Sequence, residues 1–371
     1  MDIADYLTSK PADRLYDEVL NGTAEERFSE IHARLRAGAR IAAKDGVRAF
    51  TFPETYRFAT RPEIARVRNT LHKEAIEGRR VVDASAGIGL AAIAFSQRAR
   101  EVIGIEIDPL RCALAEANAR LHNAPIRIVR CDAMSEEARE YLIQADLIFC
   151  DPARTEHAPT RHLDENTPAY QHFLENYPSV PLLYEVSPRI PIEDLPDCVE
   201  LFSFKRRHSR TTIIRNLPVP RLRAVNEHGE TLSAEPGEMP EEANIPSSLP
   251  RYLYDIDPTL LAARITHKLE SYGFKVVLLS GRAVAFSDEN RALAFCEQKK
   301  ILGAAESLEE AARIIQSVED FKRIILRYPV PSGTYWQIAH TIRPTGKGTI
   351  SVSIYRSDRY LIVADRPRTG A

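Results

Sequence analysis

The fold is decided by a short glycine turn, which reads Asp83-Ala84-Ser85-Ala86-Gly87-Ile88-Gly89. Two apolar residues, Val81 and Val82, precede the turn, and a predicted helix that runs through Phe95 follows it. Glycines at such a turn let the backbone approach a ligand closely, and the backbone N–H groups at the start of a helix favour an anionic group. The turn therefore predicts a ligand site between a strand and a helix.

From residue 80 to residue 186, short apolar runs alternate with helical stretches. After the first strand, the apolar runs are residues 102–106, 126–130, 146–150 and 182–186. Alternation with short connections is typical of an open parallel sheet with helices on both faces, a Rossmann-like α/β fold. In that architecture ligands bind beyond the carboxyl ends of the strands.

An acidic residue stands at the end of each of the first four strands, namely Asp83, Glu106, Asp132 and Asp151. Residues 87–92 fit the relaxed dinucleotide pattern, with Glu106 about twenty residues further on to bind a ribose. A pyrophosphate would be repelled by this series of carboxylates, whereas a ligand with a sulfonium, an ammonium, a ribose and an adenine would not. Such a ligand could place its ammonium at Asp83, its ribose at Glu106 and its adenine at Asp132. A tight turn that binds no ligand is the remaining interpretation.

The order and spacing of these motifs resemble the class I S-adenosylmethionine (SAM)-dependent methyltransferases. The resemblance implies SAM as the cofactor and a Rossmann-like class I methyltransferase sheet, with an N-terminal helical cap and a C-terminal α+β domain. The cofactor-binding residues that it implies are Asp83, Ser85, Ala86, Gly87, Gly89, Glu106, Ile107, Asp132, Ala133 and Asp151.

Further motifs narrow the resemblance to enzymes that modify RNA. Asp151-Pro152-Ala153-Arg154 is similar to the DPPR signature of RNA methyltransferases, with alanine in place of the second proline. The whole chain resembles methyltransferases with a C-terminal THUMP-like domain, in which a strand ending in Ser-Pro follows a DPAR motif. That strand ends here at Ser187-Pro188, and residues 252–258 resemble the phrase that opens the last domain. The resemblance implies a class of enzyme and not its target, and RNA, either tRNA or rRNA, is the leading hypothesis for the substrate.

The Asp-Pro turn carries the predicted chemistry, because methyl transfer needs an oriented nucleophile with a free lone pair. Asp151 and Pro152 place a carboxylate and carbonyl groups where they can accept hydrogen bonds from an amino group. We predict Asp151, Pro152 and Arg154 as catalytic residues, with a surface ion pair as the alternative for Arg154. Carbon-5 methylation of uridine would need a cysteine nucleophile, but none lies near Ser187-Pro188, and Cys150 is predicted as buried core. A nucleotide nitrogen is the favoured target.

The strongest basic cluster of the chain is the run at residues 205–210. We predict that its Arg206, Arg207 and Arg210 contact the phosphates of the substrate, with a solvated hairpin tip as the alternative. Thr60 is a further substrate candidate, because the chain just before the next helix could close over a ligand. A second contact could involve Lys322, Arg323, Arg327, Tyr335 and Trp336.

The 371 residues divide into four predicted parts. These are a helical region at 1–60, a methyltransferase domain at 61–217, a linker at 218–249 and a THUMP-like α+β domain at 250–371. A capping box at Thr23 predicts a helix start, and a second one at Thr60 predicts the start of a helix that ends near Gly78. Asp257 is predicted to cap a helix that ends at Gly273. In the last part, strands are predicted at residues 323–328, 334–342, 349–355 and 359–364.

Composition excludes several classes of protein. The net charge of −2 excludes a strongly basic nucleic-acid protein, although a local basic face is still allowed. No apolar run approaches the roughly 18 residues of a membrane span, so no membrane partner is expected. Five isolated cysteines fit the reducing cytoplasm. His157, His162 and His172 lack the spacing of metal ligands, so no metal is predicted, and the oligomeric state stays open.

The sequence thus predicts a SAM-dependent methyltransferase that acts on a nitrogen of a nucleotide in tRNA or rRNA. Three alternatives stay open. The first is a methyltransferase for a small molecule or a protein, and the second is a non-catalytic RNA-binding protein with a degenerate cofactor fold. The third, a nicotinamide oxidoreductase, is disfavoured by the acidic series.

Overall fold

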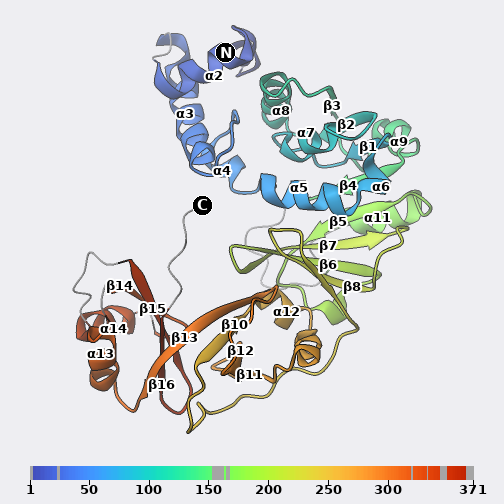
Figure 1. Cartoon of the computed structure of the whole chain (residues 1–371). Coiled ribbons are helices and arrows are strands. Elements are labelled where there is room, and N and C mark those ends of the chain that lie inside the picture. The colour runs from blue at the N-terminus through green and yellow to red at the C-terminus, as the bar shows by residue number, and fades with distance from the viewer. Residues whose placement is uncertain are drawn as a thin grey trace. The chain divides into compact units, whose positions relative to one another are not determined.

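The protein is described from a computed structural model of the whole chain (Figure 1). The structure describes residues 3–22, 26–152, 163, 168–318, 321–331, 333–342 and 349–364. The predicted cap at Thr23 and the predicted catalytic Arg154 lie outside the described residues. The chain forms two compact units, of which the first comprises residues 1–202, 209–221 and 227–229. The second comprises residues 203–208, 222–226 and 230–371.

The strands of the first unit follow the order β3-β2-β1-β4-β5-β7-β6. Their bounds are β1 (Arg80–Asp83), β2 (Glu101–Glu106), β3 (Ile126–Arg130), β4 (Leu147–Cys150), β5 (Leu182–Val186), β6 (Cys198–Phe204) and β7 (Arg207–Arg215). Strands β1 to β5 pair parallel with one another, and β7 pairs antiparallel with β5. The strand order reverses between β1 and β4, so ligands are expected beyond the carboxyl ends of these two strands.

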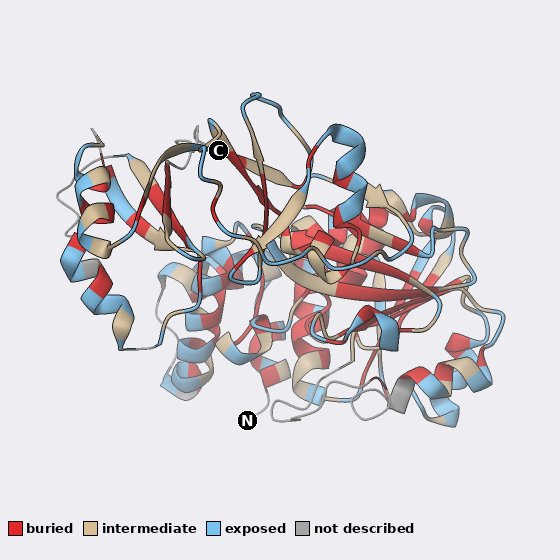
Figure 2. Ribbon diagram, turned by 90° about the horizontal axis from the view of Figure 1, so that it is seen from below, coloured by how far each residue is buried: buried red, intermediate tan, exposed pale blue. Residues whose placement is uncertain are grey.

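Helices cover both faces of this sheet. They are α5 (Pro62–Leu71), α6 (Lys73–Ile76), α7 (Leu90–Ser96), α8 (Pro109–Leu121), α9 (Glu136–Leu142), α11 (Pro168–Asn176) and a 3-10 turn at Ile192–Asp194. Side chains alternate between the faces along a strand, and Leu183 of β5 shares a buried cluster with Phe95 of α7. The next residue, Tyr184, faces the other side, where its ring lies 6.3 Å from that of Phe173 in α11. Apart from the edge strand β3, the parallel strands have buried interiors (Figure 2), and the predicted α/β fold is confirmed.

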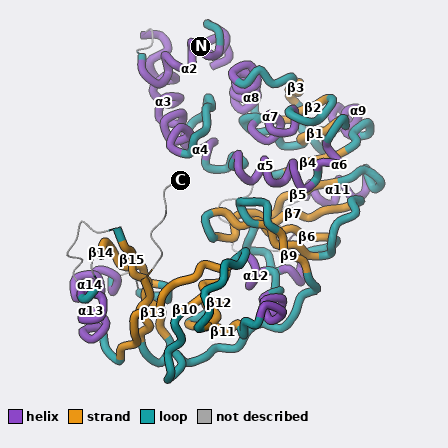
Figure 3. Tube along the Cα trace, viewed as in Figure 1, coloured by secondary structure: helices purple, strands orange, loops and turns teal. Residues whose placement is uncertain are grey.

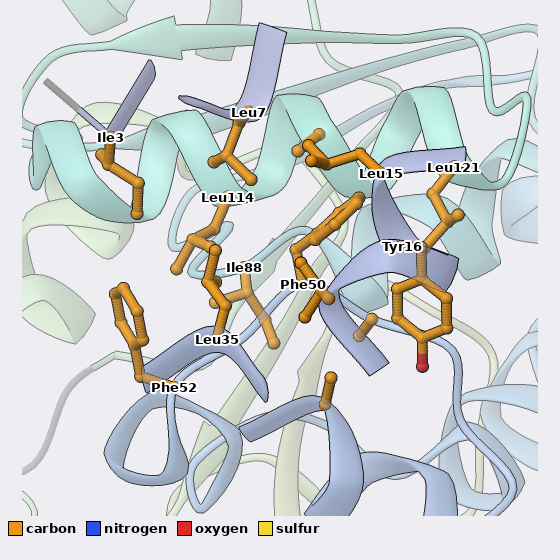
Figure 4. Packing of buried hydrophobic residues seen from close by; sticks show 14 of the residues in the cluster. Ile3, Leu7, Leu15, Tyr16, Leu35, Phe50, Phe52, Ile88, Leu114 and Leu121 are labelled. Atoms are coloured by element: carbon orange, nitrogen blue, oxygen red, sulfur yellow. The ribbon is translucent and has the colours of Figure 1, made fainter. Parts of the chain in front are cut away.

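The N-terminal region is helical, as predicted. Its elements are α1 (Ile3–Thr8), α2 (Ala12–Asn21), a 3-10 turn (Glu26–Phe28), α3 (Ser29–Lys44) and α4 (Pro53–Tyr56). Leu7, Leu15 and Leu35 from these helices pack with Leu114 and Leu121 of α8 in one buried cluster (Figure 4). The helical region therefore shares a core with α8 of the next part of the chain, and the predicted boundary at residue 60 stays a prediction.

Asn118 of α8 joins this helical region to the glycine turn. The side chain is fully buried. Its Oδ1 accepts a hydrogen bond from the Phe50 N–H at 2.7 Å, and its Nδ2 donates to the Phe50 carbonyl at 3.0 Å and to the Ile88 carbonyl at 2.9 Å. One amide thus satisfies three backbone groups from two separate segments.

Replacing Asn118 with alanine should therefore lower the free energy of unfolding by about 2–3 kcal/mol, because buried backbone groups lose their partners. Urea denaturation of the full chain measures this loss. The matched control is Asn21→Ala at an exposed helix end, where we expect a change within about 0.5 kcal/mol. Equal effects at the two sites would contradict the assignment.

Helix α5 begins later and ends earlier than predicted. Its N-cap is Arg61, with Pro62 in the first turn, and the cap residue makes no side-chain hydrogen bond. The capping box predicted at Thr60 is therefore wrong. Thr60 is instead buried beside the cavity described below. The helix ends at Leu71, and the separate short helix α6 fills the rest of the predicted span to Gly78.

The second unit contains a sheet with the strand order β11-β12-β10-β13-β16-β15-β14 (Figure 3). The strands are β10 (Tyr252–Ile256), β11 (Val276–Leu279), β12 (Arg282–Ser287), β13 (Cys296–Ala305), β14 (Phe321–Leu326), β15 (Ile350–Arg356) and β16 (Tyr360–Ala364). The other elements are β8 (Leu222–Val225), β9 (Thr231–Ser233), α12 (Pro258–Ala262), a 3-10 helix (Thr266–Tyr272), α13 (Leu308–Gln316) and α14 (Thr334–Ile342). The strands pair antiparallel except β14 and β15, which are parallel.

Two predictions for this unit are wrong. Residues 334–342 are rich in β-branched and aromatic residues and were predicted as a strand, but they form α14. Ile338 and Ile342 lie one helical turn apart and are both buried, so burial of one helix face outweighs β propensity. The single helix predicted up to Gly273 is interrupted at Arg264, whose φ is 55°.

Asp255 of β10 organises the interior of the second unit. Its carboxylate is fully buried and accepts two hydrogen bonds from Arg282, both at 2.9 Å, and one from the Tyr355 hydroxyl at 2.9 Å. Burial opposes ionisation, but Arg282 and Arg206 outweigh it and hold the pKa of Asp255 below its usual value. The polar centre of this unit is thus built for an ionised carboxylate.

Candidate functional site

The first unit encloses a cavity of about 520 Å³ at the carboxyl ends of four strands. Its walls include residues after β1, β2, β3 and β4, together with residues 58–60 and Arg210. Of the predicted site residues, it brings together Thr60, Ser85, Ala86, Gly87, Glu106, Ile107, Asp132, Ala133, Asp151, Pro152 and Arg210. These positions span 150 residues of sequence, so the sheet topology creates the site.

The glycine turn closes tightly behind the cavity. Gly87 and Gly89 have φ values of 57° and 83°, in the left-handed region that favours glycine. A side chain at Gly89 would also lie 3.2 Å from Ala115 of α8. Ser85 links two strand ends, because its Oγ accepts a hydrogen bond from the Asp151 N–H at 2.6 Å. The residue that replaces the usual first glycine thus ties the turn to the Asp-Pro motif.

Glu106 and Asp132 differ in their exposure to solvent. Glu106 is buried, and its two oxygens accept hydrogen bonds from the N–H groups of Gly87, at 2.8 Å, and Asp108, at 3.0 Å. Asp132 is exposed and accepts one from the Met134 N–H at 2.9 Å. Glu106 is therefore held in one orientation on the cavity wall.

Asp83 lies behind the turn and, among the described residues, is not one of those that line the cavity. Its Oδ1 accepts a hydrogen bond from the Ser85 N–H at 3.2 Å, while its buried Oδ2 has no hydrogen-bond partner. Burial raises the pKa of Asp83 to about 7. A contact between Asp83 and the cofactor ammonium stays a prediction.

A buried chain of charges adjoins the cavity, and two of its members were missed by sequence reasoning. Arg68 of α5 and Glu185 of β5 are each 1% exposed, and the Arg68 Nη1 donates to the Glu185 Oε1 at 3.1 Å. The Glu185 Oε2 lies 3.1 Å from the Arg210 Nε, and the Arg210 Nη2 lies 3.7 Å from the Asp151 Oδ2. Glu185 thus bridges two arginines, the second of which faces Asp151.

The Arg68 guanidinium also lies over two aromatic rings, 4.6 Å from the centre of Phe95 and 4.1 Å from that of Phe149. Burial lowers the pKa of Arg68, and the Glu185 carboxylate opposes that shift. For Arg210, burial is outweighed by Asp151 and Glu185, which raise its pKa. The neighbouring carboxylates therefore stabilise both buried guanidinium groups.

The other basic candidates, Arg206 and Arg207, are not among the residues that line this cavity. Arg206 belongs to the second unit, where its Nε lies 3.4 Å from the Glu297 Oε2 and its Nη2 donates to the Asp255 carbonyl at 2.5 Å. Arg206 and Lys205 form the turn between β6 and β7, with φ values of 56° and 49°. Arg207 is exposed. Of the basic run, residues 205–208 thus belong to the second unit and residues 209 and 210 belong to the first.

Cys150 is buried core, as predicted, and burial raises the pKa of its thiol well above the usual value. Within the part of the chain that the structure describes, no three His, Cys, Asp or Glu side chains group as metal ligands. No helix there is long and apolar enough to cross a bilayer.

Residues 55–162 match the model of the TRM5/TYW2 methyltransferase domain. Over 121 residues the chain is 28% identical to two uncharacterised S-adenosylmethionine-dependent methyltransferases, from two strains of Mycobacterium tuberculosis. This part of the chain is a methyltransferase domain of the SAM-dependent type. The match covers 32% of this chain and 32% of each relative, so the chain spans about a third of the curated relatives' length.

One solved structure supports the fold, and a second is similar over part of the chain. One is a crystal structure from Porphyromonas gingivalis W83 of a protein itself assigned only provisionally as a methyltransferase. It covers 99% of this chain and 97% of its own, with 15% identity and a TM-score of 0.69. An RNA methyltransferase from Salinibacter ruber, solved with S-adenosyl-L-homocysteine, covers 44% of this chain and 96% of its own, with 15% identity and a TM-score of 0.32.

The cavity residues fit SAM, the cofactor of this type of domain. The volume is within the range of small-molecule sites. A side chain at Gly87 would meet only the Ser85 carbonyl, at 3.9 Å, so open space lies beside the turn. Glu106 suits the ribose hydroxyls, and the exposed Ile107 and Met134 offer apolar contacts to an adenine.

Proposed function

We propose that the chain is a SAM-dependent methyltransferase whose acceptor is a nitrogen of a nucleotide in RNA, either tRNA or rRNA. The observation that carries the proposal is the cavity in which the glycine turn, Glu106 and Asp132 meet Asp151 and Pro152. Three of these groups suit a cofactor with a ribose and an adenine. The other two form the motif similar to the signature of RNA methyltransferases.

SAM, when bound, supplies a methyl group on a positively charged sulfur. The Asp151 carboxylate accepts a hydrogen bond from the amino or ring N–H of the acceptor and orients the nitrogen lone pair toward that methyl group. SAM held at Glu106 and Asp132 would supply the methyl group and leave as the neutral thioether, while the acceptor nitrogen would supply the electron pair of the new C–N bond. The proton that leaves the nitrogen passes to Asp151 or to water, and the Arg210 guanidinium lies 3.7 Å from the Asp151 carboxylate and helps to position it.

The second unit supports RNA as the substrate class. We propose that it is the THUMP-like domain and that it binds the RNA outside the cavity. Trp336 and Tyr335 are 70% and 37% exposed, which leaves two rings available for stacking. Lys322 and Arg323 of β14 are exposed and could contact phosphates. We also propose a cytoplasmic location, which the five free cysteines support.

Purified protein and SAM labelled on the methyl group test this function. We expect saturable SAM binding by calorimetry and transfer of label to total RNA, with a methylated nitrogen found by nucleoside mass spectrometry. Asp151→Asn should reduce the transfer rate by about 100-fold, because it removes the base and the orienting carboxylate. Asp17→Asn, on an exposed face of α2, should leave the rate unchanged. Label that enters only protein or small molecules would refute RNA as the substrate.

A further inference from the structure

Exposed apolar side chains gather at the cavity in the first unit. Of the nine large apolar or aromatic side chains that are exposed in the described part of the chain, three line the cavity, namely Phe58, Ile107 and Met134. Phe58 is 50% exposed and Ile107 is 62% exposed. Leaving apolar surface in contact with water is unfavourable, so its concentration at one cavity indicates apolar ligand surfaces there.

These three residues belong to two different ends of the cavity. Ile107 directly follows Glu106, and Met134 is hydrogen-bonded to Asp132, so both belong to the end that we assign to the ribose and the adenine. Phe58 comes from the segment before α5. Its carbonyl accepts a hydrogen bond from the Arg210 Nη2 at 3.4 Å, and the same nitrogen lies 3.7 Å from the Asp151 Oδ2.

Phe58 is therefore tied to the acceptor end of the cavity through one guanidinium. Two further features describe what this end can bind. The carboxylate of Asp151 lines the cavity and can accept a hydrogen bond from an N–H group of a ligand, and the half-exposed ring of Phe58 offers a flat apolar surface. The Arg57 guanidinium lies 5.6 Å from the centre of the Phe58 ring and adds a positive charge beside it.

We propose that Phe58 is the stacking platform for the acceptor base, and that the acceptor is a nucleotide whose flat ring lies against Phe58 while its N–H faces Asp151. The proposal rests on the proposed function and adds the residue that selects a flat nitrogen heterocycle. Stacking on a ring is tolerant of base identity because every base has a π face. Phe58 thus contributes to binding of a base, and Asp151 to the choice of nitrogen.

The test separates the two ends of the cavity with matched variants of the full chain. Phe58→Leu removes the ring and keeps an apolar side chain, Phe58→Trp keeps a ring, and Ile107→Ala changes the cofactor end. The readouts are the Kd for SAM by calorimetry, the KM for total RNA, and the quenching of a single-stranded RNA oligonucleotide that contains 2-aminopurine. Tyr272→Leu, an exposed aromatic residue of the second unit, is the control.

We expect Phe58→Leu to raise the KM for RNA by about 10- to 100-fold, the range of one lost base–aromatic stack, with the Kd for SAM within twofold of wild type. The quenching of 2-aminopurine should be lost in Phe58→Leu and kept in Phe58→Trp. Ile107→Ala should weaken SAM binding instead, and Tyr272→Leu should change neither quantity.

Weaker SAM binding in Phe58→Leu with an unchanged KM would place the ring at the cofactor and overturn the proposal, as would no change in either quantity. The proposed function fails separately if the wild-type protein transfers no methyl group to RNA. In that case the quenching experiment still decides whether Phe58 stacks on a base, because it needs no turnover.

Discussion

Replacing Glu185 with alanine should lower the free energy of unfolding by about 3–5 kcal/mol. The Glu185 carboxylate is 1% exposed and lies between the guanidinium groups of Arg68 and Arg210, each within 3.1 Å. Its removal leaves the Arg68 cation, which is also 1% exposed, without the partner that opposes its desolvation. The large effect therefore comes from an uncompensated buried charge. Urea denaturation of the full chain measures it.

The matched control is Glu54→Ala, which also removes a glutamate from an ion pair with an arginine. Glu54 and Arg34 are 2.6 Å apart but 58% and 50% exposed, so we expect a loss of less than about 1 kcal/mol. In the Arg68→Met background, the effect of Glu185→Ala should shrink, because the stranded charge is gone. Equal losses for Glu185→Ala and Glu54→Ala would contradict this account of the buried chain.

The part of the site that was predictable from sequence is the part formed at strand ends. Glu106 and Asp132 each follow an apolar run, and parallel strands bring such ends together at one edge of the sheet. Because each residue is adjacent in sequence to the element that positions it, the pattern alone indicates the cavity. Asp83 shows the limit of this reasoning, since it also ends a strand but is buried behind the turn.

The missed residues are those whose role depends on contacts distant in sequence. Arg68 and Glu185 are 117 positions apart, and each is a single charge inside an apolar pattern. Arg68 lies on the same helix face as Ile64 and Leu71, and Glu185 interrupts a buried strand. Two such interruptions were a usable signal, because a buried charge requires a partner of opposite sign. The sequence does not say which partner each one meets.

The basic run shows a related limit. The six neighbouring polar residues predicted one basic surface. In the structure, Arg206 instead forms an ion pair with Glu297, whereas Arg210 pairs with Glu185 and lines the cavity. Alternation along β7 and the turn at residues 205 and 206 separate them. Charge density in sequence therefore does not identify a binding face unless the strand register is known.

Replacing Asp83 with asparagine should raise the free energy of unfolding relative to the wild type, and this gain should grow as the pH rises. Burial raises the pKa of Asp83 in the folded protein to about 7 from 3.8. Below about pH 4 the carboxyl is protonated in both the folded and the unfolded chain, so it adds no pH dependence there. Between the two pKa values the unfolded chain releases a proton that the folded protein retains, and the wild type loses stability as the pH rises. The loss is complete above about pH 7 and amounts to about 4 kcal/mol, which asparagine avoids.

The measurement is the difference in free energy of unfolding between Asp83→Asn and wild type, at several pH values from 4 to 8. This difference isolates Asp83, because the other groups that titrate are present in both proteins. Asp358 provides a control of opposite sign: its pKa is lowered, first by a hydrogen bond from the Ile245 N–H at 3.1 Å. As the pH rises through the usual aspartate range, the wild type should gain free energy of unfolding that Asp358→Asn does not gain. A difference for Asp83→Asn that is flat with pH, or that falls, would show that the Asp83 carboxylate is ionised in the folded protein.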